Sequence, residues 1–209
     1  HENIRTLEGF CLGKQDQELS RVREESRRKI LGQLAEKPLE MVYTLEMPTG
    51  YGKTITALNM ASWLGLSQGY RKIIYVAPYL SILDQNSKVF EESMGRYAME
   101  HHSLAFLPTG KDLGPDVAEN LHTGQLAVEA WAGAIVCTSF QQLFKALFPG
   151  RAQDTLRRAF LHDSIIIIDE PQIISPDSWN VFLCGLEAAA EYYNLRVIFL
   201  SATMPPFKY

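Results

Sequence analysis

The apolar positions of the chain fall into short runs, separated by segments with helical spacing. Five runs are rich in β-branched side chains and do not alternate with polar residues: 41–45, 72–76, 134–137, 164–169 and 196–200. Such runs are typical of strands that are covered on both faces, as in a parallel sheet. The segments between them repeat apolar residues three or four positions apart, which indicates helices. The alternation predicts an α/β fold with right-handed crossovers, in which a mostly parallel sheet carries helices on both faces.

Two segments stand apart from this alternation. Residues 18–34 carry apolar positions at helical spacing, and their arginines and lysines are mixed with glutamates. We expect a solvated helix there, with a nucleic-acid patch as the alternative. The polar, turn-rich segment 108–121 predicts a loop or an insertion. We therefore divide the chain into an N-terminal segment with a leading helix, residues 1–36, and one folded lobe, residues 37–209.

Composition narrows the function classes only slightly. The chain has 209 residues, 46% of them apolar, and a net charge of −4, so it can bury a core but has no general attraction to nucleic acid. Its three cysteines form no CxxC pair, which argues against a disulfide framework and a zinc site and favours a reducing, cytoplasmic setting. No apolar run is long enough to span a membrane. Adjacent histidines in a strand face opposite ways, so for His101-His102 we expect sheet surface or a DNA-side loop and no shared metal ion. His162-Asp163 lacks the spaced histidines and acids of a metal cluster, so we expect a loop or the entry to a strand there.

The first candidate for chemistry is the stretch MPTGYGKT, residues 47–54, which joins the first apolar run to a helical pattern. Glycines here let backbone amides approach phosphate oxygens, and the helix that follows presents its positive N-terminus. Lys53 would reach the β- and γ-phosphates and Thr54 would help hold Mg²⁺, so the expected cofactors are ATP and Mg²⁺. The strict phosphate-loop pattern fails because Met47 stands where its first glycine belongs, and a plain strand–turn–helix is the alternative. The residues that we expect to bind nucleotide here are Thr49, Gly50, Tyr51, Gly52, Lys53 and Thr54.

The second candidate is an acidic pair that ends an apolar run. Asp169 and Glu170 follow a buried strand, and ligands of α/β sheets bind at such carboxyl ends. Asp169 would orient Mg²⁺ through its water shell. Glu170 would take the proton from an attacking water, which indicates a nucleotide hydrolase; two solvated turn acids are the alternative. Ser201 and Thr203 follow the last run, where their hydroxyls can hydrogen-bond both the acidic pair and the γ-phosphate region.

Taken in order, these stretches carry a family resemblance. PTGYGKT, DEPQ and SATMPP resemble motifs I, II and III of superfamily 2 helicases, whose fold is a RecA-like lobe with the motif III strand between the strands of motifs I and II. The resemblance adds Gln172, the last letter of DEPQ, to the nucleotide-binding residues. YVAPYLSILDQ and VCTSFQQLFKAL resemble motifs Ia and Ic, and they imply nucleic-acid contacts. The matching residues are Pro78, Ser81, Gln85, Thr138, Ser139 and Gln142.

A finer resemblance is to the CRISPR-associated helicase-nuclease of type I interference, through the PTG loop, APYLSILDQ, EHHS, TSFQQLF and Gln172. It implies an ATP-dependent motor that moves on single-stranded DNA, works with a second helicase lobe and an HD-type nuclease domain, and is recruited by an RNA-guided surveillance complex. Pro171 departs from the aliphatic residue or alanine usual at its place in motif II, without removing a catalytic group.

The resemblance also sets what the chain is expected to lack. Neither the second lobe nor the nuclease domain is expected within these 209 residues, so we expect the first lobe alone, as part of a longer protein. Gln17 and Arg23 are the candidates for adenine recognition. The alternative functions are a DExH/DEAD-box RNA helicase lobe and an interaction module that keeps a degenerate nucleotide site.

Overall fold

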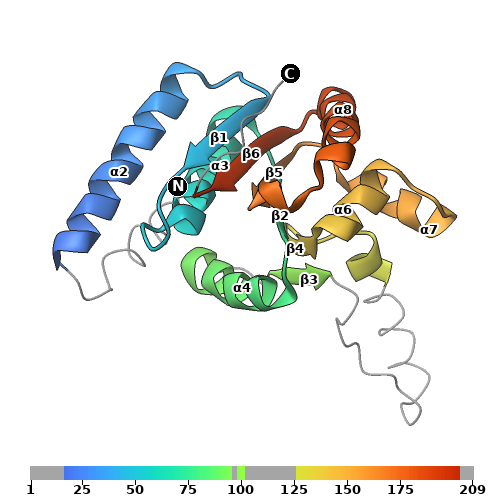
Figure 1. The fold of residues 1–209 in the computed structure, drawn as a ribbon, viewed down its shortest axis with the longest axis horizontal. Helices are drawn as coiled ribbons and strands as arrows, with labels where there is room; N and C mark the ends of the chain where they lie inside the picture. Colours follow the sequence, from blue (N-terminus) through green and yellow to red (C-terminus); the bar gives the residue numbers. More distant parts are fainter. Residues whose placement is uncertain (1–16, 96–97, 102–125, 203–209) are drawn as a thin grey trace, which may run out of the picture.

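A parallel sheet forms the centre of the molecule. The computed structural model describes residues 17–95, 98–101 and 126–202. Within these residues the strands are β1 (Val42–Glu46), β2 (Lys72–Ala77), β3 (Met99–His101), β4 (Ile135–Ser139), β5 (Ser164–Asp169) and β6 (Arg196–Ser201). They form one six-stranded sheet in the order β1-β6-β5-β2-β4-β3, and each neighbouring pair is parallel (Figure 1). The predicted α/β fold is confirmed.

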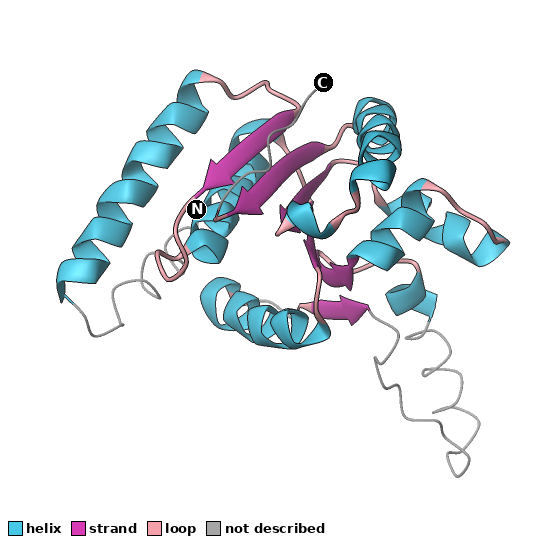
Figure 2. Ribbon diagram, viewed as in Figure 1, coloured by secondary structure: helices cyan, strands magenta, loops and turns pink. Residues whose placement is uncertain are grey.

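Helices connect the strands and cover both faces of the sheet (Figure 2). They are α2 (Gln17–Glu36), α3 (Lys53–Gln68), α4 (Leu80–Met94), α6 (Phe140–Leu147), α7 (Ala152–Thr155) and α8 (Pro176–Tyr193), with the 3₁₀ helices η1 (Leu156–Phe160) and η2 (Pro171–Ile173). One core lies between the sheet and α3 and α4, and α2 adds apolar side chains to its edge. The other core lies between the opposite face and α6 and α8.

Burial on both faces explains the unbroken apolar runs of the central strands. In β2, Ile73 and Tyr75 belong to the core shared with α3 and α4, whereas Ile74 and Val76 belong to the core shared with α6 and α8. This is the period-two alternation of a strand whose two sides are both covered, so neither side calls for polar residues.

The strand order brings the ends of β1, β5 and β6 together. β6 lies between β1 and β5, with Ser201 opposite Glu46 and Leu200 opposite Asp169. The expected position of the motif III strand, between those of motifs I and II, is therefore confirmed. Because the strands are parallel, the three loops that carry the candidate motifs all leave the sheet at the carboxyl ends of the strands.

The structure differs from the sequence-based prediction at β3, the edge strand beside β4. The pattern does not predict β3, which has only three residues and carries the polar side chains of Glu100 and His101. The predicted helix over 18–34 is confirmed as α2, and the predicted loop over 108–121 lies outside the described residues. No helix in the described part of the chain combines the length and the apolarity that a membrane crossing requires.

Candidate nucleotide-binding and catalytic site

The loop between β1 and α3 turns through two glycines in the left-handed region. Gly50 has a φ of 83° and Gly52 a φ of 81°, and Gly52 is the N-cap of α3. A residue with a Cβ adopts this region only with strain, which explains glycine at both places. The amide of Tyr51 donates to the carbonyl of Pro48 at 3.3 Å and closes the turn. Lys53 then begins α3, so the unpaired amides of a helix N-terminus face the mouth of the loop.

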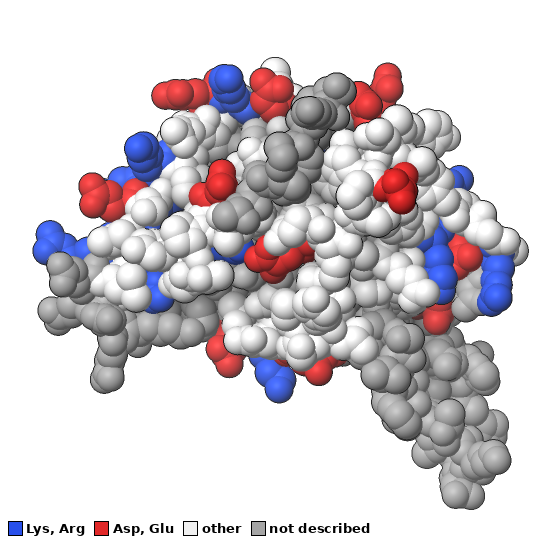
Figure 3. Space-filling model, viewed as in Figure 1, with Lys and Arg blue, Asp and Glu red and all other residues white. Residues whose placement is uncertain are grey.

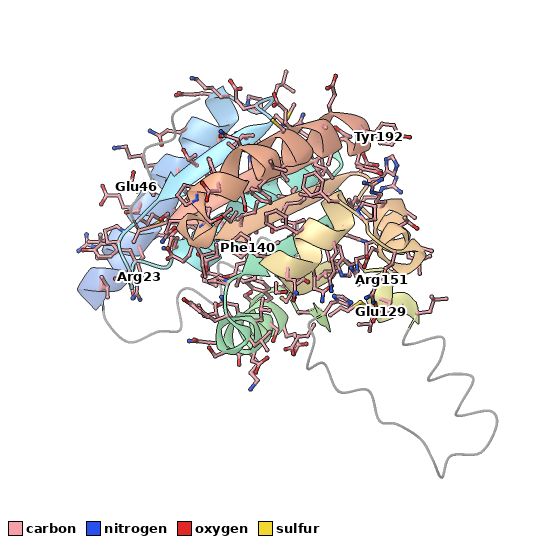
Figure 4. The ribbon with its side chains drawn as sticks, turned by 45° about the vertical axis from the view of Figure 1, so that its right-hand side comes forward. Arg23, Glu46, Glu129, Phe140, Arg151 and Tyr192 are labelled. Carbon is pink, nitrogen blue, oxygen red and sulfur yellow. The ribbon has the colours of Figure 1, made fainter. Side chains whose placement is uncertain are left out.

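Helix α2 holds this loop through Arg23. Its guanidinium donates to the Gly50 carbonyl from Nε at 3.1 Å and from Nη2 at 2.5 Å. Figure 4 shows Arg23 on α2, beside the loop that follows β1. The sequence suggested Arg23 only for adenine, and its contact with the loop backbone was missed because 27 residues separate the two partners. Adenine recognition by Arg23 stays a prediction, and the side chain of Gln17 lies outside the described part of the chain.

Motifs I and II meet in an ion pair. Lys53 Nζ lies 2.9 Å from Glu170 Oε1, and the side chain of Lys53 is only 11% exposed. Burial alone would raise the pKa of Glu170, but the hydrogen bonds from Lys53 and Gln172 and the lysine charge outweigh it and lower that pKa. The lysine predicted to bind phosphate is therefore held by the carboxylate predicted to be the base.

Gln172 extends this contact to motif III. Its Nε2 donates to Glu170 Oε2 at 2.5 Å, and its Oε1 accepts a hydrogen bond from the hydroxyl of Ser201 at 3.2 Å. Lys53, Glu170, Gln172 and Ser201 thus form one line of polar contacts across the ends of the strands. The sequence suggested Gln172 and Ser201 as nucleotide ligands but did not suggest that they bond each other. Thr203 lies outside the described residues.

The backbone at Glu170 is in an unusual conformation. Its φ is 53° and its ψ is 57°, the left-handed region that costs a non-glycine residue about 1–2 kcal/mol. Its amide donates to the carbonyl of Leu200 at 2.9 Å, which fixes the turn from β5 into η2. Such strain gathers at functional sites, and here it sets the Glu170 side chain beside Lys53.

Asp169 lies deeper than its neighbour, at the end of β5, and is 7% exposed. Its Oδ2 accepts a hydrogen bond from the hydroxyl of Tyr75 at 2.5 Å. Its Oδ1 is buried and has no hydrogen-bond partner among the described residues. Burial raises the pKa of Asp169, and the Tyr75 hydrogen bond and the Lys53 charge offset this only in part. Sequence reasoning missed Tyr75, although a tyrosine inside a buried strand signals a hydrogen-bond partner for its hydroxyl.

The oxygen atoms of Asp169 and Thr54 fit a magnesium ion that keeps most of its waters. Among the described residues, no three His, Cys, Asp or Glu side chains gather into a cage. Mg²⁺ is commonly bound through one or two protein oxygens together with waters and nucleotide phosphates. The orphaned Oδ1 of Asp169 is an acceptor for such a water, and the half-buried Thr54 carries the hydroxyl that the phosphate loop supplies.

The predicted nucleic-acid residues differ in exposure. Ser81 and Gln85 are exposed on the first turns of α4, and Pro78 precedes them. Ser139 is half-buried at the N-cap of α6.

Two further members of that set are buried. Thr138 is fully buried, and its hydroxyl donates to the His101 carbonyl at 2.8 Å. Gln142 is 7% exposed. These two side chains can reach a ligand only if their neighbours move.

The surface charge on the face shown in Figure 3 does not single out a nucleic-acid-binding surface. On the face that Figure 3 shows, the Lys, Arg, Asp and Glu side chains of the described residues are scattered and of both signs. Any nucleic acid on this face would be held by hydroxyls, amides and helix N-termini more than by a basic patch.

His101, expected on a sheet surface or in a loop, lies in a strand, and its side chain is buried. His101 ends β3, with Nε2 at 3.4 Å from Glu129 Oε2 and its ring edge-on to Trp131 at a centroid distance of 5.9 Å. His162 precedes β5 and packs edge-on against Tyr193 at 4.9 Å. His162 lies in the turn that leads into β5, in agreement with the predicted loop or strand entry; His102 lies outside the described residues.

Comparisons with known proteins show the family and the fold of the chain. The family model for the type III restriction enzyme res subunit (ResIII) matches residues 15–205. The CRISPR-associated nuclease/helicase Cas3 of Haloferax volcanii is 32% identical over 232 aligned positions, which cover 96% of this chain and 24% of that protein. The chain therefore spans about a quarter of the length of this relative.

Solved structures with low sequence identity share the fold. The helicase domain of Pyrococcus furiosus Hef has a TM-score of 0.52 and 19% identity, over 84% of this chain and 33% of that one. The DUF1998 helicase MrfA has a TM-score of 0.55 and 16% identity, over 98% of this chain and 29% of that one. The Type ISP restriction-modification enzyme LlaGI, solved as a nuclease-deletion mutant with a DNA substrate mimic, has a TM-score of 0.52 and 19% identity, over 89% of this chain and 17% of that one. The expected helicase-lobe fold is confirmed, and the chain belongs to the family described as the type III restriction enzyme res subunit.

Proposed function

We propose that this chain is the ATP-binding first motor lobe of a superfamily 2 DNA helicase, and that the longer protein is a type I CRISPR interference helicase-nuclease of the cytoplasm. The observation that supports the motor lobe is the line Lys53–Glu170–Gln172–Ser201, which joins three helicase-like motifs at one edge of a parallel sheet. The 32% identity to Cas3 of Haloferax volcanii supports the finer assignment. Its partners are single-stranded DNA, a second helicase lobe, an HD-type nuclease domain and an RNA-guided surveillance complex.

ATP binding begins at the glycine loop. The phosphates lie against the amides of residues 50–54, and Lys53 exchanges Glu170 for the β- and γ-phosphate oxygens. The exchange is feasible because both acceptors are anionic, so the half-buried ammonium stays paired throughout. Thr54 and Asp169 would hold Mg²⁺, Asp169 through the water shell of the ion, and the ion would offset the charge on the phosphate oxygens.

The same exchange prepares Glu170 for catalysis. While Lys53 and Gln172 donate to it, the pKa of Glu170 is lowered and the carboxylate is a weak base. Transfer of Lys53 to the nucleotide removes one of these causes, so the basicity of Glu170 rises toward what proton transfer from water needs. Glu170 thereby becomes a stronger base only after ATP has bound.

Gln172 and Ser201 carry the state of Glu170 into the sheet. Any movement of Glu170 changes the acceptor of the Gln172 amide, and Gln172 in turn is bonded to Ser201 at the end of β6. In the intact motor this line reports the nucleotide to the second lobe. That lobe supplies arginine fingers and the other half of the DNA track.

The test is ATP hydrolysis by the full-length protein with single-stranded DNA or RNA of the same sequence. We expect DNA to stimulate ATP hydrolysis, and we expect Lys53→Ala to abolish this hydrolysis. Lys37→Ala is the matched control, because this lysine is exposed and hydrogen-bonds through its backbone: its amide donates to the Leu34 carbonyl at 3.2 Å, and its carbonyl accepts from the Tyr43 hydroxyl at 3.1 Å. Equal or stronger stimulation by RNA would support the RNA helicase alternative. ATP binding with no hydrolysis under any condition would support the interaction module.

A further inference from the structure

A line of hydrogen bonds runs from α4 through β2 to the acidic pair. Asn86 Nδ2, on α4, donates to the hydroxyl of Tyr75 at 2.6 Å. That hydroxyl donates to Asp169 Oδ2 at 2.5 Å. An amide N–H can only donate and an ionised carboxylate can only accept, so the chemistry of the two ends fixes the direction of both bonds. The three side chains come from three elements and meet only in the folded protein.

Tyr75 has little freedom to move. Its side chain is fully buried, and its ring lies edge-on to Phe90 of α4, with centroids 5.0 Å apart and an interplanar angle of 85°. Two contacts with the same helix, one polar and one aromatic, therefore set the position of the hydroxyl. A hydroxyl held in this way is a fixed support for the carboxylate that it bonds.

The support leaves one oxygen of Asp169 available. The hydroxyl of Tyr75 engages Oδ2, whereas Oδ1 is buried and has no hydrogen-bond partner among the described residues. Buried polar atoms are rarely left unsatisfied, and an exception calls for a functional explanation. A water of the Mg²⁺ shell would satisfy Oδ1, and the position of that water would depend on how Tyr75 holds the carboxylate.

The far end of the line lies on the helix that carries two exposed candidates for nucleic-acid contact. Ser81 and Gln85 are exposed on α4, and Gln85 directly precedes Asn86. Leu83 and Phe90 anchor the inner face of α4 in the core. A shift of α4 caused by a bound strand would therefore reach the Tyr75 hydroxyl through both Asn86 and Phe90.

We propose that Tyr75 is a positioning residue for the carboxylate that holds Mg²⁺, and that Asn86 makes this positioning depend on nucleic acid bound along α4. The inference rests on the proposed function. It adds a route from the strand to the metal that runs through the interior of the lobe, separate from the line through Gln172 and Ser201. Outer partners of metal ligands typically change metal affinity about 10–100-fold when they are removed.

The first experiment uses Tyr75→Phe in the full-length protein, which keeps the ring and removes the hydroxyl. We expect calorimetry to show about tenfold weaker ATP binding with Mg²⁺ and unchanged binding in EDTA, together with about a tenfold rise in the Mg²⁺ concentration that half-saturates hydrolysis. Tyr70→Phe is the matched control, since it removes another tyrosine hydroxyl. That hydroxyl donates to Asn194 Oδ1 over 3.3 Å and is not part of the site. A thermal melt checks that both variants fold. Wild-type Mg²⁺ dependence in folded Tyr75→Phe overturns the positioning role.

The second experiment uses Asn86→Ala, which leaves the bond between Tyr75 and Asp169 in place. In the wild type, single-stranded DNA should lower the half-saturating Mg²⁺ concentration, and Asn86→Ala should lose this effect while it still binds DNA. Asn180→Ala, at an exposed asparagine of α8, should keep it. An unchanged DNA effect in Asn86→Ala, or none in the wild type, overturns the coupling. Lys53→Ala distinguishes a failure of the proposed function from a failure of the coupling. If Lys53→Ala binds ATP normally, the proposed function fails. If Lys53→Ala loses ATP binding, an unchanged DNA effect in Asn86→Ala counts only against the coupling.

Discussion

At the scale of single residues, the pairing of Lys53 with Glu170 determines what each substitution should do. Glu170→Gln is expected to preserve ATP binding and remove most turnover, because an amide cannot accept the proton of the attacking water. The loss of a general base typically lowers the rate by about 10²–10⁴. Since the substitution also takes the anionic partner from Lys53, ATP affinity should be equal or higher. Equilibrium binding and single-turnover hydrolysis by the full-length protein measure both effects.

A matched control for this substitution is Glu187→Gln, at an exposed carboxylate on α8. It should leave both ATP binding and hydrolysis unchanged. Near-normal turnover in Glu170→Gln would identify another group as the base.

Lys53→Ala should weaken ATP binding. The substitution removes a charge-assisted contact with the phosphates, which is worth about 1.5–3 kcal/mol, or roughly a ten- to hundredfold change in affinity. Part of this loss is offset because Glu170, whose side chain is 29% exposed, no longer holds the lysine and can be hydrated. Isothermal calorimetry with and without Mg²⁺ measures the change. Unchanged affinity would place the nucleotide somewhere else.

The residues of the candidate site stand out in the sequence, but their hydrogen-bond partners do not. Short motifs with a local spacing of residue types indicate the chemistry of Lys53, Asp169 and Glu170. The support of Asp169 by Tyr75 joins residues 94 positions apart, so no local pattern reveals it. The hold of Arg23 on Gly50 is hidden in the same way, because the acceptor is a backbone carbonyl that carries no sequence signal.

At the scale of elements, the turn into α3 depends on backbone conformation more than on space. An added Cβ at Gly50 would meet no atom within 4 Å, yet its φ is +83°. Gly50→Ala should therefore lower the free energy of unfolding by about 1–2 kcal/mol through strain alone. Gly32 also has open space but lies inside the exposed helix α2, where Gly32→Ala should raise that free energy by about 0.5–1 kcal/mol. Urea unfolding of the two variants should give opposite signs; a stabilising Gly50→Ala would contradict the left-handed turn.

Elements were predictable to the extent that burial leaves a pattern. The central strands are covered on both faces and appear as unbroken apolar runs, and all were predicted. β3 lies at the sheet edge with three residues and mixed polarity, so tertiary pairing with β4 decides its conformation. The position of β6 between β1 and β5 came from the family resemblance, since periodicity alone does not order strands.

At the scale of the whole molecule, the edge of the sheet beside β3 should make stability depend on pH. Burial and the charge of Arg157 lower the pKa of His101 below its ordinary value of 6.5, against the opposing effect of Glu129. The unfolded chain therefore binds more protons than the folded one as pH falls below 6.5, and the free energy of unfolding falls with it. Glu129, whose pKa is lowered despite its burial, adds its own loss only below its ordinary value of 4.5.

His101→Gln should remove the first of these two losses. Urea unfolding of the wild type and the variant between about pH 7.5 and pH 5 measures it, and the wild type should lose more stability over this interval. His162→Gln is the control, because this histidine is exposed and its ring packs against Tyr193. Parallel profiles for the wild type and His101→Gln would show that His101 does not titrate differently on folding.

The lobe as a unit should be nearly inactive by itself. The isolated 209-residue chain should bind ATP weakly and barely hydrolyse it, because Lys53, Asp169 and Glu170 all lie on this lobe and would address the γ-phosphate from one side. An arginine finger from the proposed second lobe would act from the other side, and such a finger is worth about 10³–10⁵ in turnover in related nucleotide hydrolases. ATP turnover by this chain and by the full-length protein, each with and without single-stranded DNA, measures the difference, and Glu170→Gln in both controls for contaminating activity. Robust DNA-stimulated hydrolysis by the isolated chain would mean that the site is complete within one lobe or is assembled by self-association.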